Sequence, residues 1–170
     1  MFYIIGVHHG VQFDKKYSLT QKFISYFKDV VRKLRIEVIA EESSEDALKK
    51  WGIEKTFVQK ISENKSSKYI ACDPNITERK TLGIRSDEEI KKEKGLPNIL
   101  THQQLNILDQ EKIKDFIRRE KHWLKKIKDY SDRQIIFICG LRHLDTTLRV
   151  FTFQDLLSTN SYKYTLLKKF

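Results

Sequence analysis

The segment QIIFICG at 134–140 is the least polar stretch of the chain, and it constrains the fold more than any other feature. Strands that are apolar throughout, without alternation, are typical of parallel sheets covered on both faces. Four more segments rich in β-branched or aromatic residues are predicted strands: 2–6, 37–42, 68–73 and 162–167. The sequence therefore predicts a mostly parallel sheet of four or five strands.

Between these strands the apolar residues recur at helical spacing. Helices are predicted from Ser18 to Leu34, after Ser43 or Ser44 in SSEDALKKWG, after Pro74, at about 110–130 and at about 145–157. Strands that alternate with helices form a layered fold with helices on both faces of the sheet. The predicted fold class is an α/β three-layer sandwich, with a mostly parallel 4-5-stranded sheet flanked by helices, in one domain at 1–170.

Residues 85–100 (RSDEEIKKEKGLPNIL) differ from the rest of the chain. They are highly charged, contain one of the two prolines and show little periodicity. We interpret them as an irregular, mobile insertion in the domain. A segment of this kind beside a site could act as a lid.

The 170 residues are 39% hydrophobic and 33% charged, which is typical of a soluble globular protein. No apolar run approaches the roughly 18–20 residues that span a bilayer, and FYIIGV is too short for a signal peptide. Cys72 and Cys139 lie far apart, each at the end of an apolar run, so we expect buried, reduced thiols. These features predict a cytoplasmic protein without a membrane partner.

The formal net charge is +10. Clustered cations bind phosphates by releasing condensed counterions, so an anionic small molecule or a nucleic acid is the expected partner. Much of the excess charge lies in dispersed pairs such as Lys49-Lys50 and Lys125-Lys126, which also suit ordinary helix surfaces. The charge alone therefore leaves open specific binding and a merely basic surface.

Polar residues that can do chemistry follow four of the predicted strands. In chain order they are His8 and His9, Glu41 and Glu42, Asp73, and His143. His9 and His143 each stand three residues after a glycine, Gly6 and Gly140, so the spacing G-x-x-H occurs twice. The carboxyl ends of parallel strands meet at one edge of the sheet, where such folds bind ligands. We therefore expect these side chains to share a site.

Two histidines and a carboxylate could hold a divalent metal ion, so the predicted metal ligands are His9, Glu42 and His143. Without a metal, a histidine beside a carboxylate serves acid–base catalysis. Each residue also has an ordinary interpretation. Glu41 and Glu42 suit the first turn of a helix, Asp73 suits an N-cap, and the two glycines suit tight turns.

The predicted helix at 110–130 carries RREKHW, in which Arg119 and Trp123 share a face at i and i+4. If Trp123 packs against the sheet, Arg119 lies near the strand ends and can bind an anion or a developing oxyanion. The alternative is a solvated charged face. The candidate catalytic residues are therefore His9, Glu41, Glu42, Arg119 and His143, and the candidate substrate-binding residues are His8, Asp73, Arg79 and Arg142.

The order of these motifs resembles the Tiki/TraB superfamily, which also takes in the erythromycin-esterase and ChaN-like proteins. The matching residues are Gly6 and His9, Glu41 and Glu42, Arg119, then Gly140 and His143. The segments CDPNITERKTLGI and REKHW also look like those of short bacterial proteins of unknown function. The resemblance implies an α/β protein in which both G-x-x-H histidines and the strand-end glutamate line one pocket. It also implies hydrolytic activity, metal-dependent in the Tiki proteases, although this chain is much shorter than the larger members.

Together, the residues and the resemblance predict a small cytoplasmic hydrolase that acts on an anionic substrate such as a phosphoester, a nucleotide or a nucleic acid. A divalent metal ion is the cofactor that the predicted ligands would hold. One alternative is a non-catalytic nucleic-acid or nucleotide-binding protein that uses the same residues and its lysines. The other is a structural or interaction protein, in which the histidines only satisfy backbone groups.

Overall fold

A five-stranded, all-parallel sheet forms the centre of the protein, seen in a computed structural model that describes residues 1–14, 16, 18–65 and 67–170. The strands are β1 (Phe2–Val7), β2 (Val38–Glu41), β3 (Lys68–Ala71), β4 (Ile135–Gly140) and β5 (Tyr164–Lys169). Their order across the sheet is β3-β2-β4-β1-β5. β4 pairs with β2 on one side and with β1 on the other, which explains why its sequence is the least polar of all.

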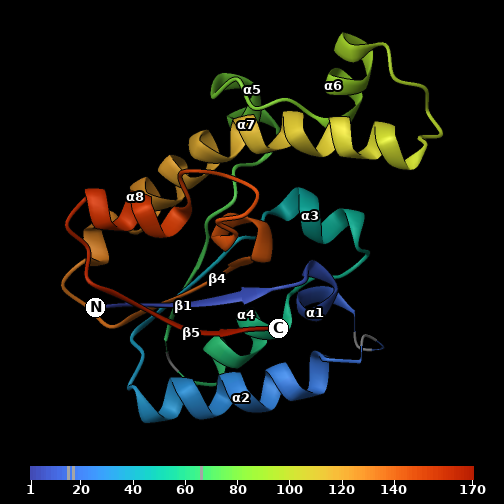
Figure 1. The fold of residues 1–170 in the computed structure, drawn as a ribbon. Helices are drawn as coiled ribbons and strands as arrows, with labels where there is room; N and C mark the ends of the chain where they lie inside the picture. Colours follow the sequence, from blue (N-terminus) through green and yellow to red (C-terminus); the bar gives the residue numbers. More distant parts are fainter. Residues whose placement is uncertain (15, 17, 66) are drawn as a thin grey trace.

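Helices cover both faces of the sheet (Figure 1). They are α1 (His9–Phe13), α2 (Thr20–Lys33), α3 (Glu45–Lys50), α4 (Phe57–Glu63), α5 (Ile76–Thr81), α6 (Asp87–Lys94), α7 (His102–Ile127) and α8 (Phe153–Thr159), with 3-10 turns η1 (Lys128–Tyr130) and η2 (Leu141–Leu144). Trp123 of α7 and Phe153 of α8 pack on one face, whereas Phe23 of α2 and Val58 of α4 pack on the other. The predicted three-layer α/β sandwich is confirmed.

The burial of the strands follows their position in the sheet. Every residue of β2 and β4 is buried, because each of these strands has a neighbour on both sides and helices on both faces. The edge strands β3 and β5 are only partly buried, and they contain the lysines Lys68, Lys168 and Lys169. Lysines at sheet edges discourage pairing with another chain.

The prediction of an irregular segment at 85–100 was wrong. Helix α6 occupies its centre, and it begins at a capping box in which Ser86 and Glu89 exchange side-chain and backbone hydrogen bonds. Arg85 anchors the segment to α7 through Asp115 (Nε to Oδ2, 3.0 Å) and Glu111 (Nη1 to Oε2, 3.1 Å). The sequence of α6 shows no helical spacing of apolar residues, because the helix buries a single residue, Ile90.

Two helix boundaries also differ from the predictions, and two short helices, α1 and α4, were not predicted. The long helix α7 begins at His102 instead of about residue 110, since Thr101 and Gln104 form a capping box there. The helix expected at about 145–157 starts only at Phe153, because Asp145 and Thr147 form a local turn held by side-chain hydrogen bonds. Helix α4 was not predicted, although Thr56 caps its first turn.

Two composition-based expectations concern the membrane and the cysteines. Within the described part of the chain, no helix is both long and apolar enough to cross a membrane. Cys72 and Cys139 are both buried, and both are free thiols.

Candidate functional site

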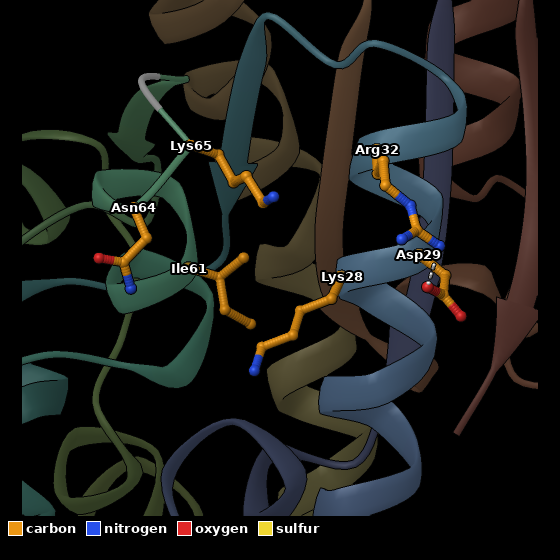
Figure 2. Close-up of a pocket in the computed structure, with 6 residues that line it drawn as sticks. All are labelled: Lys28, Asp29, Arg32, Ile61, Asn64 and Lys65. Carbon is orange, nitrogen blue, oxygen red and sulfur yellow. Dashed lines mark hydrogen bonds and ion pairs between the residues drawn. The ribbon is translucent and has the colours of Figure 1, made fainter.

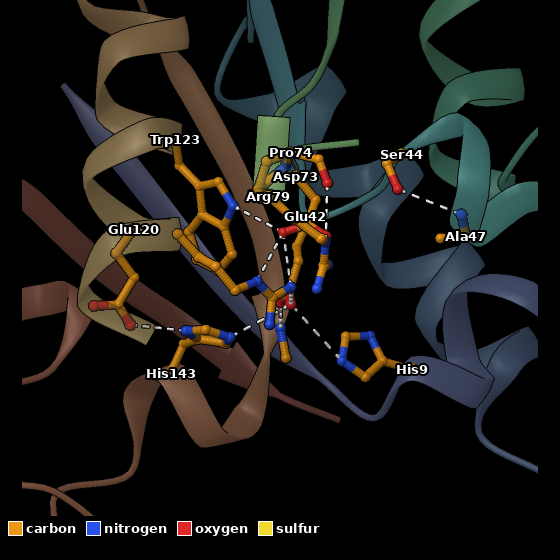
Figure 3. Close-up of polar contacts among 12 residues, drawn as sticks. His9, Glu42, Ser44, Ala47, Asp73, Pro74, Arg79, Glu120, Trp123 and His143 are labelled. Carbon is orange, nitrogen blue, oxygen red and sulfur yellow. Dashed lines mark hydrogen bonds and ion pairs between the residues drawn. The ribbon is translucent and has the colours of Figure 1, made fainter. Parts of the chain in front are cut away.

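Glu42 is the centre of a polar cluster at the carboxyl edge of the sheet (Figure 3). Its Oε1 lies 2.5 Å from Nη2 of Arg119, 3.4 Å from Nε2 of His143 and 3.9 Å from Nε2 of His9. Its Oε2 accepts a 2.7 Å hydrogen bond from the backbone N–H of Gly140. Segments that follow β1, β2 and β4, together with α7, therefore meet at one carboxylate.

The charge state of Glu42 follows from these neighbours. Burial favours the neutral acid, but the charges of His143 and Arg119 outweigh it and hold the pKa of Glu42 well below its usual range. Glu42 is thus a carboxylate at neutral pH, enclosed by cationic groups and one backbone donor.

Asp73, which follows β3, holds the arginines of the cluster. Its Oδ1 accepts hydrogen bonds from Arg119 (Nε, 2.9 Å, and Nη2, 2.7 Å) and from the indole N–H of Trp123 (3.3 Å). Its Oδ2 accepts a hydrogen bond from Arg79. Trp123 is fully buried against the sheet, so Arg119 one turn earlier is drawn to the strand ends, as its spacing predicts.

His143 lies in a buried slot between two carboxylates. Its Nδ1 is 2.7 Å from Oε1 of Glu120 on α7, while its Nε2 faces Glu42, and its side chain is only 2% exposed. The ring stacks on Phe116, with centroids 4.0 Å apart. Burial disfavours the imidazolium, yet the charge of Glu42 and the hydrogen bonds with Glu120 and Glu42 outweigh it and raise the pKa of His143. Arg149 donates two further hydrogen bonds to Glu120 (2.5 and 2.9 Å).

Glu41 belongs to a different set of contacts, because neighbouring residues of an extended chain point to opposite faces. Its carboxylate is fully buried and accepts hydrogen bonds from Gln12 (2.9 Å), Thr56 (2.7 Å) and Tyr69 (2.7 Å). Burial raises the pKa of Glu41, and the three hydrogen bonds limit that rise. Glu41 therefore lies behind the cluster and does not face Glu42's partners.

Gln12 connects Glu41 to His9. The amide Nε2 donates to Oε1 of Glu41, so the amide oxygen is the atom 3.1 Å from Nδ1 of His9. Since that oxygen only accepts, Nδ1 of His9 carries the hydrogen and Nε2 presents a lone pair in the neutral imidazole. This Nε2 is the atom that faces Glu42, and the His9 side chain is 51% exposed. His9 is the most exposed of the three side chains that face Oε1 of Glu42.

The two motif glycines are required by close packing and not by tight turns, since neither has a positive φ. A Cβ at Gly140 would lie 2.9 Å from Nε2 of His9 and 3.2 Å from Oε2 of Glu42. A Cβ at Gly6 would lie 2.8 Å from Cδ1 of Leu144, within the segment after β4. Each glycine therefore makes room for side chains of the other G-x-x-H segment.

The structure brings together most, but not all, of the predicted site residues. His9, Glu42, Arg119 and His143 meet directly, and Asp73 and Arg79 adjoin them. Arg142, predicted to bind substrate, instead makes a two-pronged ion pair with Asp109 of α7 (2.6 and 2.7 Å). His8 is exposed and forms the N-cap of α1.

Sequence reasoning missed Gln12, Glu120 and Arg149. Gln12 follows His9 by three residues on a helix, a spacing that brings side chains together and could have been noticed. Glu120 and Arg149 reach His143 from distant segments, and no local pattern in the sequence marks them.

The predicted metal ligands His9, Glu42 and His143 converge, but they do not fit a metal ion. The guanidinium of Arg119 lies 2.5 Å from the same Glu42 oxygen that both imidazoles face, so a cation already neutralises that oxygen. Among the described residues, no group of three or more His, Cys, Asp or Glu side chains is arranged to hold a metal. The prediction of a metal set is corrected accordingly: the cation that lies at Glu42 beside the two histidines is the guanidinium of Arg119.

A surface pocket lies elsewhere, between α2 and the end of α4 (Figure 2). It is lined by Lys28, Asp29, Arg32, Ile61, Asn64 and Lys65, with a volume of about 280 Å³. Arg32 donates to Asp29 at 2.9 Å, whereas Lys28 and Lys65 form no ion pair with the described residues. The pocket is thus basic and separate from Glu42.

Fold and site together define a parallel α/β protein with a histidine–carboxylate–arginine cluster at the carboxyl edge of its sheet. No family model, no curated protein and no solved structure matches the chain. The resemblance to the Tiki/TraB superfamily therefore stays a prediction based on the motif residues.

Proposed function

We propose that the protein is a hydrolase in which His9 is the general base that activates water. The observation that carries the proposal is the chain of hydrogen bonds from Glu41 through Gln12 to His9. It fixes the imidazole with its lone pair at Nε2, on the exposed side of a buried charged cluster. A base held in one tautomer by a neighbour is a recurring feature of acid–base catalysis.

The chemical step uses groups that the cluster holds in place. Nε2 of His9 takes a proton from water while the water oxygen bonds to the electrophilic atom of an ester or phosphoester. The imidazolium that forms is stabilised by the carboxylate of Glu42, 3.9 Å away. As the bond to the leaving group breaks, His9 returns the proton to the leaving oxygen. The enzyme thus ends the cycle in its starting state.

Arg119 is placed to stabilise developing negative charge. Its Nε and Nη2 are bound by Asp73 and Glu42, whereas Nη1 donates to none of the described residues. Two N–H groups of a rigid guanidinium therefore remain for a substrate oxygen. His143 does not contact the substrate in this proposal. Its charge and its contact with Glu42 hold that carboxylate in position, so His143 is a positioning residue.

An anionic substrate, and a phosphoester in particular, suits the charge of the molecule. The net charge of +10 raises the local concentration of anions around the whole surface. The buried carboxylates at the cluster are each paired with arginine or histidine, so they present little uncompensated negative charge to a phosphate.

The test compares His9→Ala with His102→Ala, a matched control at an exposed histidine at the start of α7. Hydrolysis of p-nitrophenyl phosphate, bis(p-nitrophenyl) phosphate and p-nitrophenyl acetate is measured at pH 7.5. We expect His9→Ala to lower kcat by about 10²- to 10⁴-fold and His102→Ala to leave it unchanged. Gln12→Met, which keeps the side-chain length but removes both hydrogen bonds, should lower kcat with little change in KM. Equal activity of His9→Ala and wild type would overturn the proposal.

A second candidate function, non-catalytic binding of nucleic acid or nucleotides, is favoured by the basic pocket of Lys28, Arg32 and Lys65. A binder of this kind would lose affinity linearly with the logarithm of salt concentration. Lys28→Ala with Lys65→Ala should then reduce the slope by about two contacts in a fluorescence-anisotropy titration with a single-stranded oligonucleotide. This result, together with undetectable turnover in wild type, would favour the binder over the hydrolase.

A further inference from the structure

A row of three aromatic rings runs from the proposed base His9 through Phe13 to Trp51. The ring of His9 stacks on Phe13 with centroids 6.5 Å apart and planes at 20°. Phe13 in turn stacks on Trp51 with centroids 5.3 Å apart and planes at 22°. His9 and Phe13 lie on α1, and Trp51 is the C-cap of α3, so the row joins the segments that follow β1 and β2.

Trp51 ends this row with an open face. Phe13 is buried and covers one face of the indole, whereas Trp51 is 45% exposed, and no other ring of the described residues stacks on it. A single exposed apolar side chain is ordinary on a protein surface. Its stacking on Phe13, which in turn stacks on the ring of the proposed base, is what distinguishes Trp51 from the other exposed apolar residues.

The surroundings of Trp51 are basic. Lys49 and Lys50 form the last turn of α3, immediately before Trp51, and both are exposed. Neither makes an ion pair with the described residues, so both ammonium groups are available to an anion. An indole face beside paired lysines fits a ligand that combines a planar ring with a negative charge, and a nucleotide has both.

We propose that Trp51 stacks on the base of a nucleotide whose chain places a phosphoester at Nε2 of His9. The inference rests on the proposed hydrolase and names its substrate class: a short single-stranded nucleic acid. The two ring-to-ring steps separate Trp51 from His9 by more than one ring, so a dinucleotide bridges the two better than a mononucleotide. One base stacks on the indole, the single phosphodiester faces His9, and the charges of Lys49 and Lys50 raise the local concentration of the anion.

Intrinsic fluorescence provides the test, because the chain has only two tryptophans. Trp123 is fully buried, so an added ligand can stack only on Trp51. The His9→Ala protein is titrated with the dinucleotide ApA, adenosine monophosphate, ribose 5-phosphate and N-acetylphenylalaninamide at low salt. We expect ApA and adenosine monophosphate to quench emission and ribose 5-phosphate to leave it unchanged. Trp51→Phe should abolish the quenching, since only Trp123 then emits.

Calorimetric titration of ApA separates stacking from fluorescence artefacts. Trp51→Ala should raise the Kd for ApA about 5- to 150-fold, while Trp51→Phe, which keeps a ring, should raise it less. Thermal unfolding checks that both variants remain folded. An unchanged Kd in Trp51→Ala would overturn the inference, and stronger quenching by N-acetylphenylalaninamide than by ApA would replace the nucleotide with an aromatic peptide.

The outcomes distinguish this inference from the proposed function, because binding is measured in a variant without the base. Hydrolysis of phosphoesters by wild type without quenching by ApA would overturn only the nucleotide assignment. Quenching by ApA without hydrolysis by wild type would overturn only the hydrolase.

Discussion

The two G-x-x-H segments end at histidines that face the same oxygen of Glu42 from very different surroundings. His9 is half exposed, and its Nδ1 meets the neutral amide of Gln12. His143 is buried, and its Nδ1 meets the carboxylate of Glu120. The neutral partner only orients the first ring, whereas the anionic partner also favours a charge on the second.

This difference shows that a sequence motif can fix the position of a side chain without fixing its charge or its hydrogen-bond partners. The spacing after each glycine brings both imidazoles to the carboxyl edge of the sheet, because β1 and β4 are parallel neighbours. The group that Nδ1 of each imidazole contacts then determines the protonation state of that ring. His9 is half exposed to solvent, whereas His143 is buried between two carboxylates that favour its charged form.

The largest expected effect comes from removing the anionic partner of His143. Glu120→Gln would leave His143 and Arg149 buried beside an amide that can oppose only part of their charge. We expect a loss of about 3–5 kcal/mol in the free energy of unfolding, measured by urea denaturation. Glu88→Gln, at an exposed position, is the control and should change stability by less than about 0.5 kcal/mol. Equal stability of the two variants would mean that His143 is neutral.

Alanine substitution at the two motif glycines should have different effects, mainly on stability at Gly6 and mainly on hydrolysis at Gly140. Gly6→Ala forces the buried Leu144 to move, so we expect it to cost about 1–3 kcal/mol of stability while sparing hydrolysis. Gly140→Ala brings a Cβ to 2.9 Å from the half-exposed ring of His9, which can move, and to 3.2 Å from the buried carboxylate of Glu42. We therefore expect a smaller loss of stability than in Gly6→Ala. Hydrolysis should then fall about 100-fold, since a displacement of about 1 Å is enough to misalign a base. Thermal unfolding and kcat measured on both variants check the pair, and the reverse pattern would contradict the roles assigned here.

The pH dependence of stability should report His143. Because its folded pKa is raised above the unfolded value of about 6.5, its stabilising contribution is complete below about pH 6.5 and is lost as pH rises through the folded pKa. The urea concentration at the unfolding midpoint should therefore decrease as the pH rises above about 6.5 and through the folded pKa of His143. His143→Gln should flatten this part of the profile. A His9→Ala profile that flattens equally would remove the distinction between the two histidines.

The smallest expected effect is that of Arg142→Ala, next to His143 in the sequence. Its ion pair with Asp109 is partly exposed, and pairs that solvent reaches contribute about 0–1 kcal/mol. We expect nearly unchanged stability and unchanged kcat and KM. A rise in KM would restore Arg142 as a substrate-binding residue and widen the site beyond Glu42.

Local sequence patterns predicted the fold well because buried positions are occupied by apolar residues, whose spacing differs between strands and helices. The apolar strands and the helical spacing of Phe23, Phe27 and Trp123 were enough to indicate three layers. Helix α6 escaped notice, since capping by Ser86 and ion pairs of Arg85 stabilise it without an apolar stripe. The site residues at strand ends were predicted as a group, because parallel topology carries every strand end to one edge.

The sequence by itself determined that polar residues after four strands would reach one edge, because parallel strands end on the same side of the sheet. These residues are His8, His9, Glu41, Glu42, Asp73 and His143. Only the tertiary structure decided which partners those side chains have. It turned Glu41 away to Gln12, Thr56 and Tyr69, set Arg119 where a metal ion was expected, and enclosed His143 with Glu120. The reason is physical: spacing along the chain sets position, whereas charge and tautomer depend on neighbours that lie far apart in the sequence and meet only when the layers pack.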